Sequence, residues 1–127
     1  MVYAEFLNGK ISELRETLKG IAPVSLTGAF IPLYDRQIII MPTEDVIKRE
    51  SINMHSHTVT FVLLCSIKTL KKDEEITNII DFTGAVQDEI EKHNEYIINR
   101  IVYDYRAEQN FVLKTGAVII STKFETK

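Results

Sequence analysis

The feature that most constrains the fold of this chain is the alternation of side chains over residues 58–67. The apolar residues at every second position are Val59, Phe61, Leu63, Cys65 and Ile67. The positions between them hold Thr58, Thr60, Val62, Leu64 and Ser66. Successive side chains of a β-strand point to opposite faces, so one face of this segment is wholly apolar and the other is apolar only in its middle. We therefore predict a central strand with one face in the core and the other partly covered.

Three other segments have the composition of strands. Residues 36–41 are rich in β-branched side chains, and we expect Pro42 to end this strand because proline cannot donate a ladder hydrogen bond. Residues 99–105 and 111–124 alternate as residues 58–67 do, with a polar turn at 106–110 between them. Gly116 lies inside the last segment and is expected to mark a β-bulge.

Two amphipathic helices are predicted. In the first, the apolar residues recur every three or four positions and are Tyr3, Leu7, Ile11, Leu14 and Leu18. Gly20 follows it, at the place where a glycine with positive φ commonly ends a helix. The second helix is expected to begin at Asp73, whose carboxylate suits a helix N-terminus. Its apolar stripe is Ile76, Ile79, Ile80, Val86 and Ile90.

The order of these elements is helix, strand, strand, helix, strand, strand. A doubly wound parallel sheet would require strands and helices to alternate, whereas adjacent strand pairs favour antiparallel pairing. We predict an α+β fold, in which an antiparallel or mixed sheet of about four to five strands has two helices packed on one face. The 127 residues suit one domain, residues 1–127, since domains commonly contain about 100–150 residues.

Charge and cysteine content argue against several classes of protein. The formal net charge is −3, and the basic cluster Lys68, Lys71 and Lys72 is followed at once by the acidic run 73–75. Nucleic-acid binding needs concentrated positive charge, so we do not expect it here. The single cysteine, Cys65, excludes an internal disulfide and fits a reducing compartment. With neither a secretory signal nor a membrane-spanning stretch in the pattern, we expect a soluble protein in the cytoplasm.

The sequence contains no recognisable catalytic motif. Neither a Gly-x-Ser-x-Gly nucleophile elbow nor a glycine-rich phosphate loop is present. His55 and His57 would point to the same side of a strand, but a metal site needs a third and usually a fourth ligand. Cys65 lies in an apolar strand that disfavours a thiolate, and the adjacent carboxylates of Glu44 and Asp45 are expected to be exposed. We predict that the protein is not an enzyme and holds no cofactor or metal.

Aromatic residues near the predicted strand 99–105 suggest a contact surface. Tyr96, Tyr103 and Tyr105 occur close to Arg106. Tyrosine and arginine are over-represented among interface anchors, which makes these four residues candidates for an interface. Strand tyrosines are also ordinary residues that cover a sheet edge with their hydroxyls in water, and this second interpretation remains open.

The order of elements over nearly the whole chain is more informative than any single motif. An amphipathic helix is followed by the short strand Ile38-Ile39-Ile40-Met41-Pro42, a charged loop, the long strand 58–67, a second helix from Asp73 and a closing hairpin, 99–124. In order and length this pattern resembles the tail terminator and tail-completion proteins of long-tailed bacteriophages and prophages. That family has no diagnostic catalytic or ligand motif, so the resemblance assigns no individual residue.

The resemblance implies a structural role in phage assembly. Proteins of this family form a homo-oligomeric, hexameric ring that caps the tail tube where it meets the head or neck connector. The implied partners are other copies of the chain, the tail tube protein and the connector protein, with no membrane and with DNA only passing through the ring. The implied location is the host cytoplasm during assembly and the viral tail of the virion afterwards.

The resemblance also implies that an extended segment between strands reaches the tail tube. Here that segment is 43–57, which we expect to be a loop that is mobile when free and becomes ordered on its partner. Its polar candidates for partner contact are Glu44, Asp45, Lys48, Arg49 and Glu50. Its apolar candidates are Ile47, Ile52 and Met54.

Three alternatives follow from the same sequence. A small ligand-binding or regulatory α+β domain would have a defined pocket and would form a dimer. Another phage neck or minor capsid adaptor is the interpretation nearest to a tail terminator. A metal-dependent enzyme would have to use His55 and His57.

Overall fold

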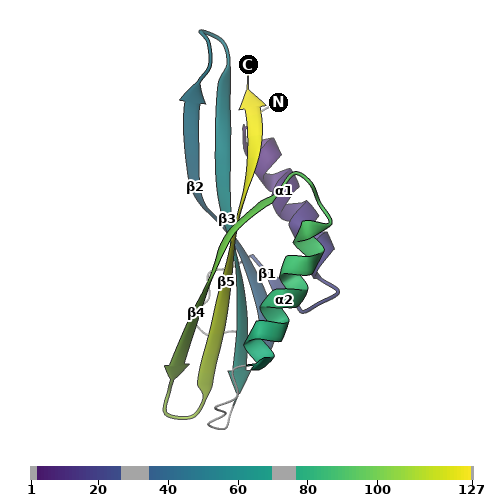
Figure 1. Ribbon diagram of the computed structural model, residues 1–127, viewed down its shortest axis with the longest axis vertical. Helices are drawn as coiled ribbons and strands as arrows, with labels where there is room; N and C mark the ends of the chain where they lie inside the picture. Colours follow the sequence, from purple (N-terminus) through teal and green to yellow (C-terminus); the bar gives the residue numbers. More distant parts are fainter. Residues whose placement is uncertain (1–2, 27–34, 70–76, 127) are drawn as a thin grey trace.

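The computed structural model describes residues 3–26, 35–69 and 77–126. In this part of the chain a five-stranded mixed sheet forms one layer, and two helices pack on one face of it (Figure 1). The helices are α1 (Tyr3–Leu18) and α2 (Thr77–Glu91). The strands are β1 (Val24–Ser25), β2 (Arg36–Arg49), β3 (His55–Thr69), β4 (Ile97–Ala107) and β5 (Val112–Thr126). The predicted α+β fold class is confirmed.

β3 lies at the centre of the sheet, as the alternation of residues 58–67 predicts. The strand order is β1-β2-β3-β5-β4, in which the β1–β2 pair is parallel and the other pairs are antiparallel. β3 pairs with β5 along its full length, from His55 opposite Thr126 to Thr69 opposite Val112. On its other side it pairs with β2 over almost the same length. The strand therefore has hydrogen-bonded neighbours along both edges.

The core fills the space between the helices and one face of the sheet. The predicted apolar set of β3 is fully buried on that face, together with residues of β5 such as Val118 and Ile120. α1 contributes Leu14 and Leu18. The buried stripe of α2 is Ile79, Phe82, Thr83, Val86 and Ile90.

The predicted stripe of α2 is wrong at one position. Ile80 is exposed, and Phe82 and Thr83 are buried instead. Residues 79, 82, 83, 86 and 90 follow one another at spacings of one, three and four, so they share one face. Ile80 is one position away from Ile79, about 100° around the helix, and therefore points away from that face. The predicted residues Asp73 and Ile76 lie outside the described residues.

Pro42 does not end β2, so the prediction that the strand stops at this proline is wrong. The strand continues to Arg49, and its register with β3 shifts between Pro42 and Glu44. β1 pairs only with Ile38 and Ile39, so Pro42 lies where no described strand is paired to the outer side of β2. Proline is tolerated at an edge position or a bulge because no ladder hydrogen bond needs its missing N–H there.

The end of α1 also differs from the prediction. Among the described residues no glycine has a positive φ, so Gly20 does not form the expected left-handed cap. Instead, Lys19 N donates to Arg15 O at 3.0 Å and Ile21 N donates to Leu18 O at 2.9 Å, which tightens the last turn. Neither described helix is long and apolar enough to cross a membrane.

Gly116 serves close packing of α2 against the sheet instead of forming a bulge. It pairs in regular register with Cys65 on one side and Tyr103 on the other, and the irregularity of this hairpin lies between Ile98 and Arg100. A Cβ added at Gly116 would overlap Thr83 Cγ2 of α2. The Thr83 hydroxyl is hydrogen-bonded to Ile79 O at 3.0 Å and to the Tyr103 hydroxyl at 3.1 Å, so this side chain is not free to rotate away.

We expect Gly116→Ala to lower the free energy of unfolding by about 1–3 kcal/mol, the usual cost of overpacking a core. Urea denaturation followed by circular dichroism measures this change. Gly9→Ala and Gly84→Ala are matched controls, because a Cβ at either position meets no atom within 4 Å. Both lie inside helices, so each control is expected to stabilise the protein by about 0.5–1 kcal/mol. A neutral or stabilising Gly116→Ala would contradict the close packing.

Candidate assembly surface

The segment predicted to be a mobile loop is a β-hairpin. Residues 43–49 belong to β2 and residues 55–57 belong to β3, so the loop prediction for 43–57 is wrong, and only residues 50–54 form a turn. We call residues 44–58 the hairpin arm. It extends the sheet past the N-terminal end of α1 (Figure 1). Charge in residues 44–50 made the segment look like a loop, although charged side chains are also common on edge strands.

Local contacts hold the turn of the hairpin arm. Arg49 pairs with His55 at the end of the ladder. Glu50 N donates to Met54 O at 2.9 Å, which closes the turn. Ser56 Oγ donates to Glu50 Oε1 at 3.0 Å, and Arg49 Nε donates to Ser51 O at 3.3 Å. Glu50, Arg49 and Met54 therefore help to shape the turn itself.

The hairpin arm exposes apolar side chains to solvent. Val46, Ile47 and Ile52 are 55%, 59% and 80% exposed. Val46 and Ile47 point to opposite faces of β2, and Ile52 lies in the turn. Glu44, Lys48 and Arg49 lie beside them and are also exposed. The arm thus presents both apolar and charged side chains to solvent.

A hydrogen bond between two largely buried side chains and an aromatic stack hold the base of the hairpin arm against α1. His57 is 8% exposed, and its Nδ1 forms a 2.8 Å hydrogen bond with Asp45 Oδ2. The His57 ring stacks on Tyr3 with 5.3 Å between centroids, and Phe124 stacks on Phe6 at 3.9 Å. Burial, together with the adjacent Asp45 carboxylate, raises the pKa of the Tyr3 hydroxyl. Asp45, which was expected to be exposed, is therefore a structural contact.

We expect Asp45→Ala to lower the free energy of unfolding by about 1–3 kcal/mol, because it leaves the buried His57 imidazole without this partner. Chemical denaturation measures the loss. Glu44→Ala is the matched control, since Glu44 is adjacent and exposed, and a surface change of this kind usually stays within about 0.5 kcal/mol. Equal effects of the two substitutions would mean that the Asp45–His57 contact does not hold the arm.

The opposite edge of the sheet is formed by β4. No other described strand pairs with its outer side. Ile97, Val102, Tyr103 and Tyr105 are exposed there, and Arg106 Nε lies 2.7 Å from Glu108 Oε1. Tyr103 and Tyr105 thus remain candidates for an interface, as does Arg106.

The prediction that Tyr96 is an interface residue is wrong. It is 8% exposed and belongs to the core. It precedes β4 and packs near Lys10 of α1, whose Nζ lies 5.5 Å from the centre of its ring. A residue in this position stabilises the monomer and is not available as a surface anchor.

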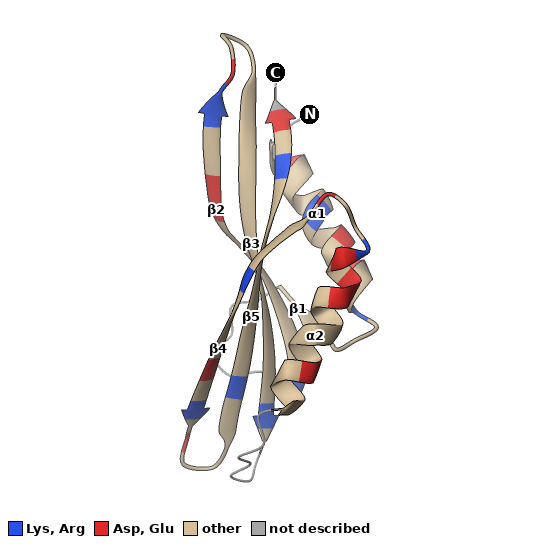
Figure 2. Ribbon diagram, viewed as in Figure 1, with Lys and Arg blue, Asp and Glu red and all other residues tan. Residues whose placement is uncertain are grey.

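Charged side chains are distributed unevenly over the molecule. Lys, Arg, Asp and Glu are absent from residues 55–67 of β3 and from residues 115–122 of β5. Figure 2 shows them instead on the helices, on the hairpin arm and near the β4–β5 turn. The middle parts of β3 and β5 are therefore apolar or neutral, whereas β4 carries Arg100 opposite Ile119.

Cys65 lies in the core and not in a reactive environment. It is fully buried on the helix-covered face of β3. Burial raises the pKa of its thiol to about 12. The thiolate form that a nucleophile needs is thus strongly disfavoured at neutral pH.

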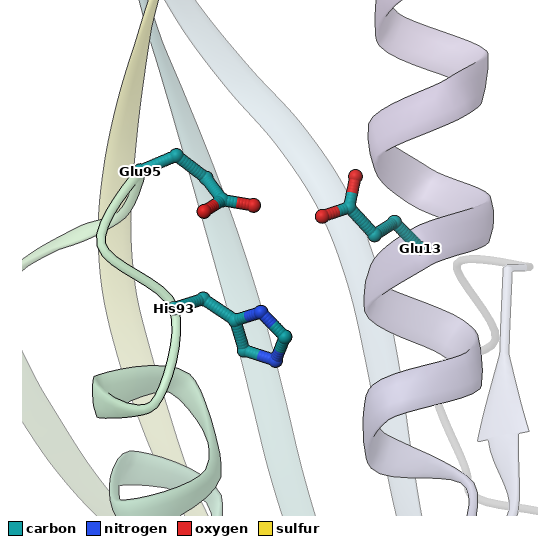
Figure 3. A group of neighbouring side chains, drawn as sticks. All are labelled: Glu13, His93 and Glu95. Carbon is teal, nitrogen blue, oxygen red and sulfur yellow. The ribbon is translucent and has the colours of Figure 1, made fainter.

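The potential metal ligands do not include the predicted histidine pair. Among the described residues, Glu13, His93 and Glu95 form a group whose ligand atoms all lie within 4.8 Å of one another. Glu13 lies on α1, whereas His93 and Glu95 lie between α2 and β4, and Figure 3 shows their side chains directed toward a common space. Sequence reasoning missed this group because its members come from distant parts of the chain.

Two hollows on the described surface have linings that mix apolar and polar groups. One, of about 520 Å³, is lined by Ser12, Arg15, Glu16, Lys19, Pro23 and Val24. The other, of about 310 Å³, is lined by Asn94, Glu95, Ile97, Ser121, Thr122 and Lys123. Small-molecule sites are usually concave and mostly apolar with a few polar groups, so the ligand-binding alternative stays a prediction.

Comparison with known proteins found no protein-family model that matches this chain, and no curated protein sequence matches it.

Proposed function

We propose that this chain is a structural assembly protein of a phage or prophage tail, and that its copies associate side by side into a ring. The tail assignment rests on the resemblance in element order. The ring rests on one structural observation, which is that the sheet of the described residues presents two different open edges. One is β2 beyond Ile39, including the hairpin arm, and the other is β4.

Two unlike edges favour contacts between different surfaces of neighbouring copies. An unpaired strand edge presents free N–H and C=O groups that can pair with another chain. When two different patches meet, the contact is heterologous, and repeated contacts close into a ring if the rotation between copies allows it. A hexameric ring capping the tail tube is the form that the resemblance implies.

The apolar side chains at both edges support the same arrangement. Val46, Ile47 and Ile52 are exposed on the hairpin arm, and Val102 and Tyr105 are exposed on β4. Covering such groups supplies the main favourable term in association. Charged neighbours at both edges, such as Lys48 and Arg106, select the correct partner and disfavour indiscriminate pairing.

We expect light scattering over a concentration series, combined with negative-stain microscopy, to reveal six-fold rings. Ile47→Glu on the hairpin arm and Val102→Glu on β4 should each shift the protein to monomers while circular dichroism stays unchanged. Ile80→Glu is the matched control, because Ile80 is an exposed isoleucine on α2 and belongs to neither edge strand. The Ile80→Glu variant should form the same oligomer as the wild type.

Other oligomeric states would contradict this proposal. A compact dimer that survives both edge substitutions would favour the regulatory-domain alternative. Light scattering that shows only monomers at every concentration would exclude a ring.

The turn of the hairpin arm also generates a prediction about tail completion. Lys48 and Arg49 are exposed at the end of β2, where a partner can reach them. We expect the double substitution Lys48→Glu, Arg49→Glu to leave the sheet and helices folded, although it removes the hydrogen bond from Arg49 Nε to Ser51 O in the turn. We expect it to block tail completion in the phage or prophage that encodes the chain. A plaque assay with complementation measures this effect. Intact, infectious particles from the double variant would exclude the arm as the contact with the tail tube.

A further inference from the structure

The group formed by Glu13, His93 and Glu95 concentrates negative charge at one place between α1 and the start of β4. Lys10 Nζ lies 3.4 Å from Glu13 Oε2 and 3.7 Å from Glu95 Oε1. One ammonium thus faces two carboxylates, and their combined charge exceeds what Lys10 can neutralise.

A buried hydroxyl next to this group lacks a partner. Tyr96 is more than nine-tenths buried, and its hydroxyl oxygen has no hydrogen-bond partner among the described residues. Its ring lies edge-on to His93 at 6.5 Å between centroids. Buried polar atoms without a partner are rare in native proteins and often mark an absent water or ion.

We propose that Glu13, His93 and Glu95 bind a divalent transition-metal ion of the zinc class. An imidazole with two carboxylates suits Zn²⁺, whereas Mg²⁺ and Ca²⁺ prefer oxygen ligands alone. Metal-to-ligand distances of about 2.0–2.2 Å allow ligand atoms to lie up to about 4 Å apart. The present spacing of up to 4.8 Å therefore closes with a small movement of the exposed Glu13 side chain.

The bound ion replaces Lys10 as the cation between the two carboxylates. Three protein ligands leave at least one coordination position for water. The ion joins α1 to the segment between α2 and β4, two parts of the chain that no ladder hydrogen bond connects. The site therefore stabilises the packing of the helices on the sheet and lies at the start of β4.

The test is a titration of the full chain, made without a polyhistidine tag and stripped with a chelator. Calorimetry with Zn²⁺ should show one ion per chain, and Co²⁺ should give the visible absorption of a bound ion. Mg²⁺ should not compete. Thermal unfolding should shift upward at saturating Zn²⁺, because a ligand that binds only the native state stabilises it.

Four variants locate the site. Glu13→Gln and His93→Gln should each weaken Zn²⁺ binding by at least about tenfold, since even indirect supports of metal ligands cost about 10–100-fold when removed. Lys10→Gln should strengthen binding, because it removes the competing ammonium. Glu16→Gln is the matched control on α1, where Glu16 is exposed and pairs with Lys19 instead.

Three results would overturn the proposal. They are the absence of saturable Zn²⁺ binding, affinity unchanged by Glu13→Gln, and affinity lost in His55→Gln but kept in His93→Gln. Circular dichroism verifies that each variant is folded. Glu13 is exposed on a helix surface, so Glu13→Gln and Lys10→Gln still decide the matter if His93→Gln does not fold.

Discussion

The pairing of β3 along both of its edges is the constraint on which the rest of the structure depends. Its apolar face, from Val59 to Ile67, provides the surface on which α1 and α2 pack. Because β2 and β5 follow it over nearly its full length, the sheet extends past the helices and forms the hairpin arm. The same arrangement places β4 at one edge and the outer side of β2 at the other. Core, arm and open edges therefore all follow from one long central strand.

The sequence was most informative where a pattern was local and strong. The alternation in residues 58–67 predicted the central strand, and the spacing from Tyr3 to Leu18 predicted α1. The hairpin arm was missed because residues 44–50 have the charge of a loop, and their strand structure depends on pairing with β3 and not on local composition. Pro42 was misread for a related reason, since whether a proline ends a strand depends on whether a neighbour needs its N–H. Gly116 similarly acquires its role only through Thr83 of the distant helix α2.

The candidate surfaces were predicted in part. Three tyrosines were predicted to be interface residues. Tyr96 is instead buried in the core, whereas Tyr103 and Tyr105 are exposed. Asp45 was grouped with exposed carboxylates, yet it pairs with the buried His57. The Glu13–His93–Glu95 group has no signature in the sequence, since its spacing arises only when α1 packs beside the segment that enters β4. Such groups are defined by tertiary packing, which one sequence does not reveal.

Amide hydrogen exchange at increasing protein concentration tests the central claim most directly, since it reads protection residue by residue. The account predicts that outward-facing amides of β2 between Ile40 and Arg49 and of β4 between Ile97 and Ala107 gain protection together as copies associate. Amides of β3 should be protected at every concentration, and those of α2 should not change. Protection that appears at neither edge, or at only one of them, would contradict assembly through two unlike open edges of a single sheet.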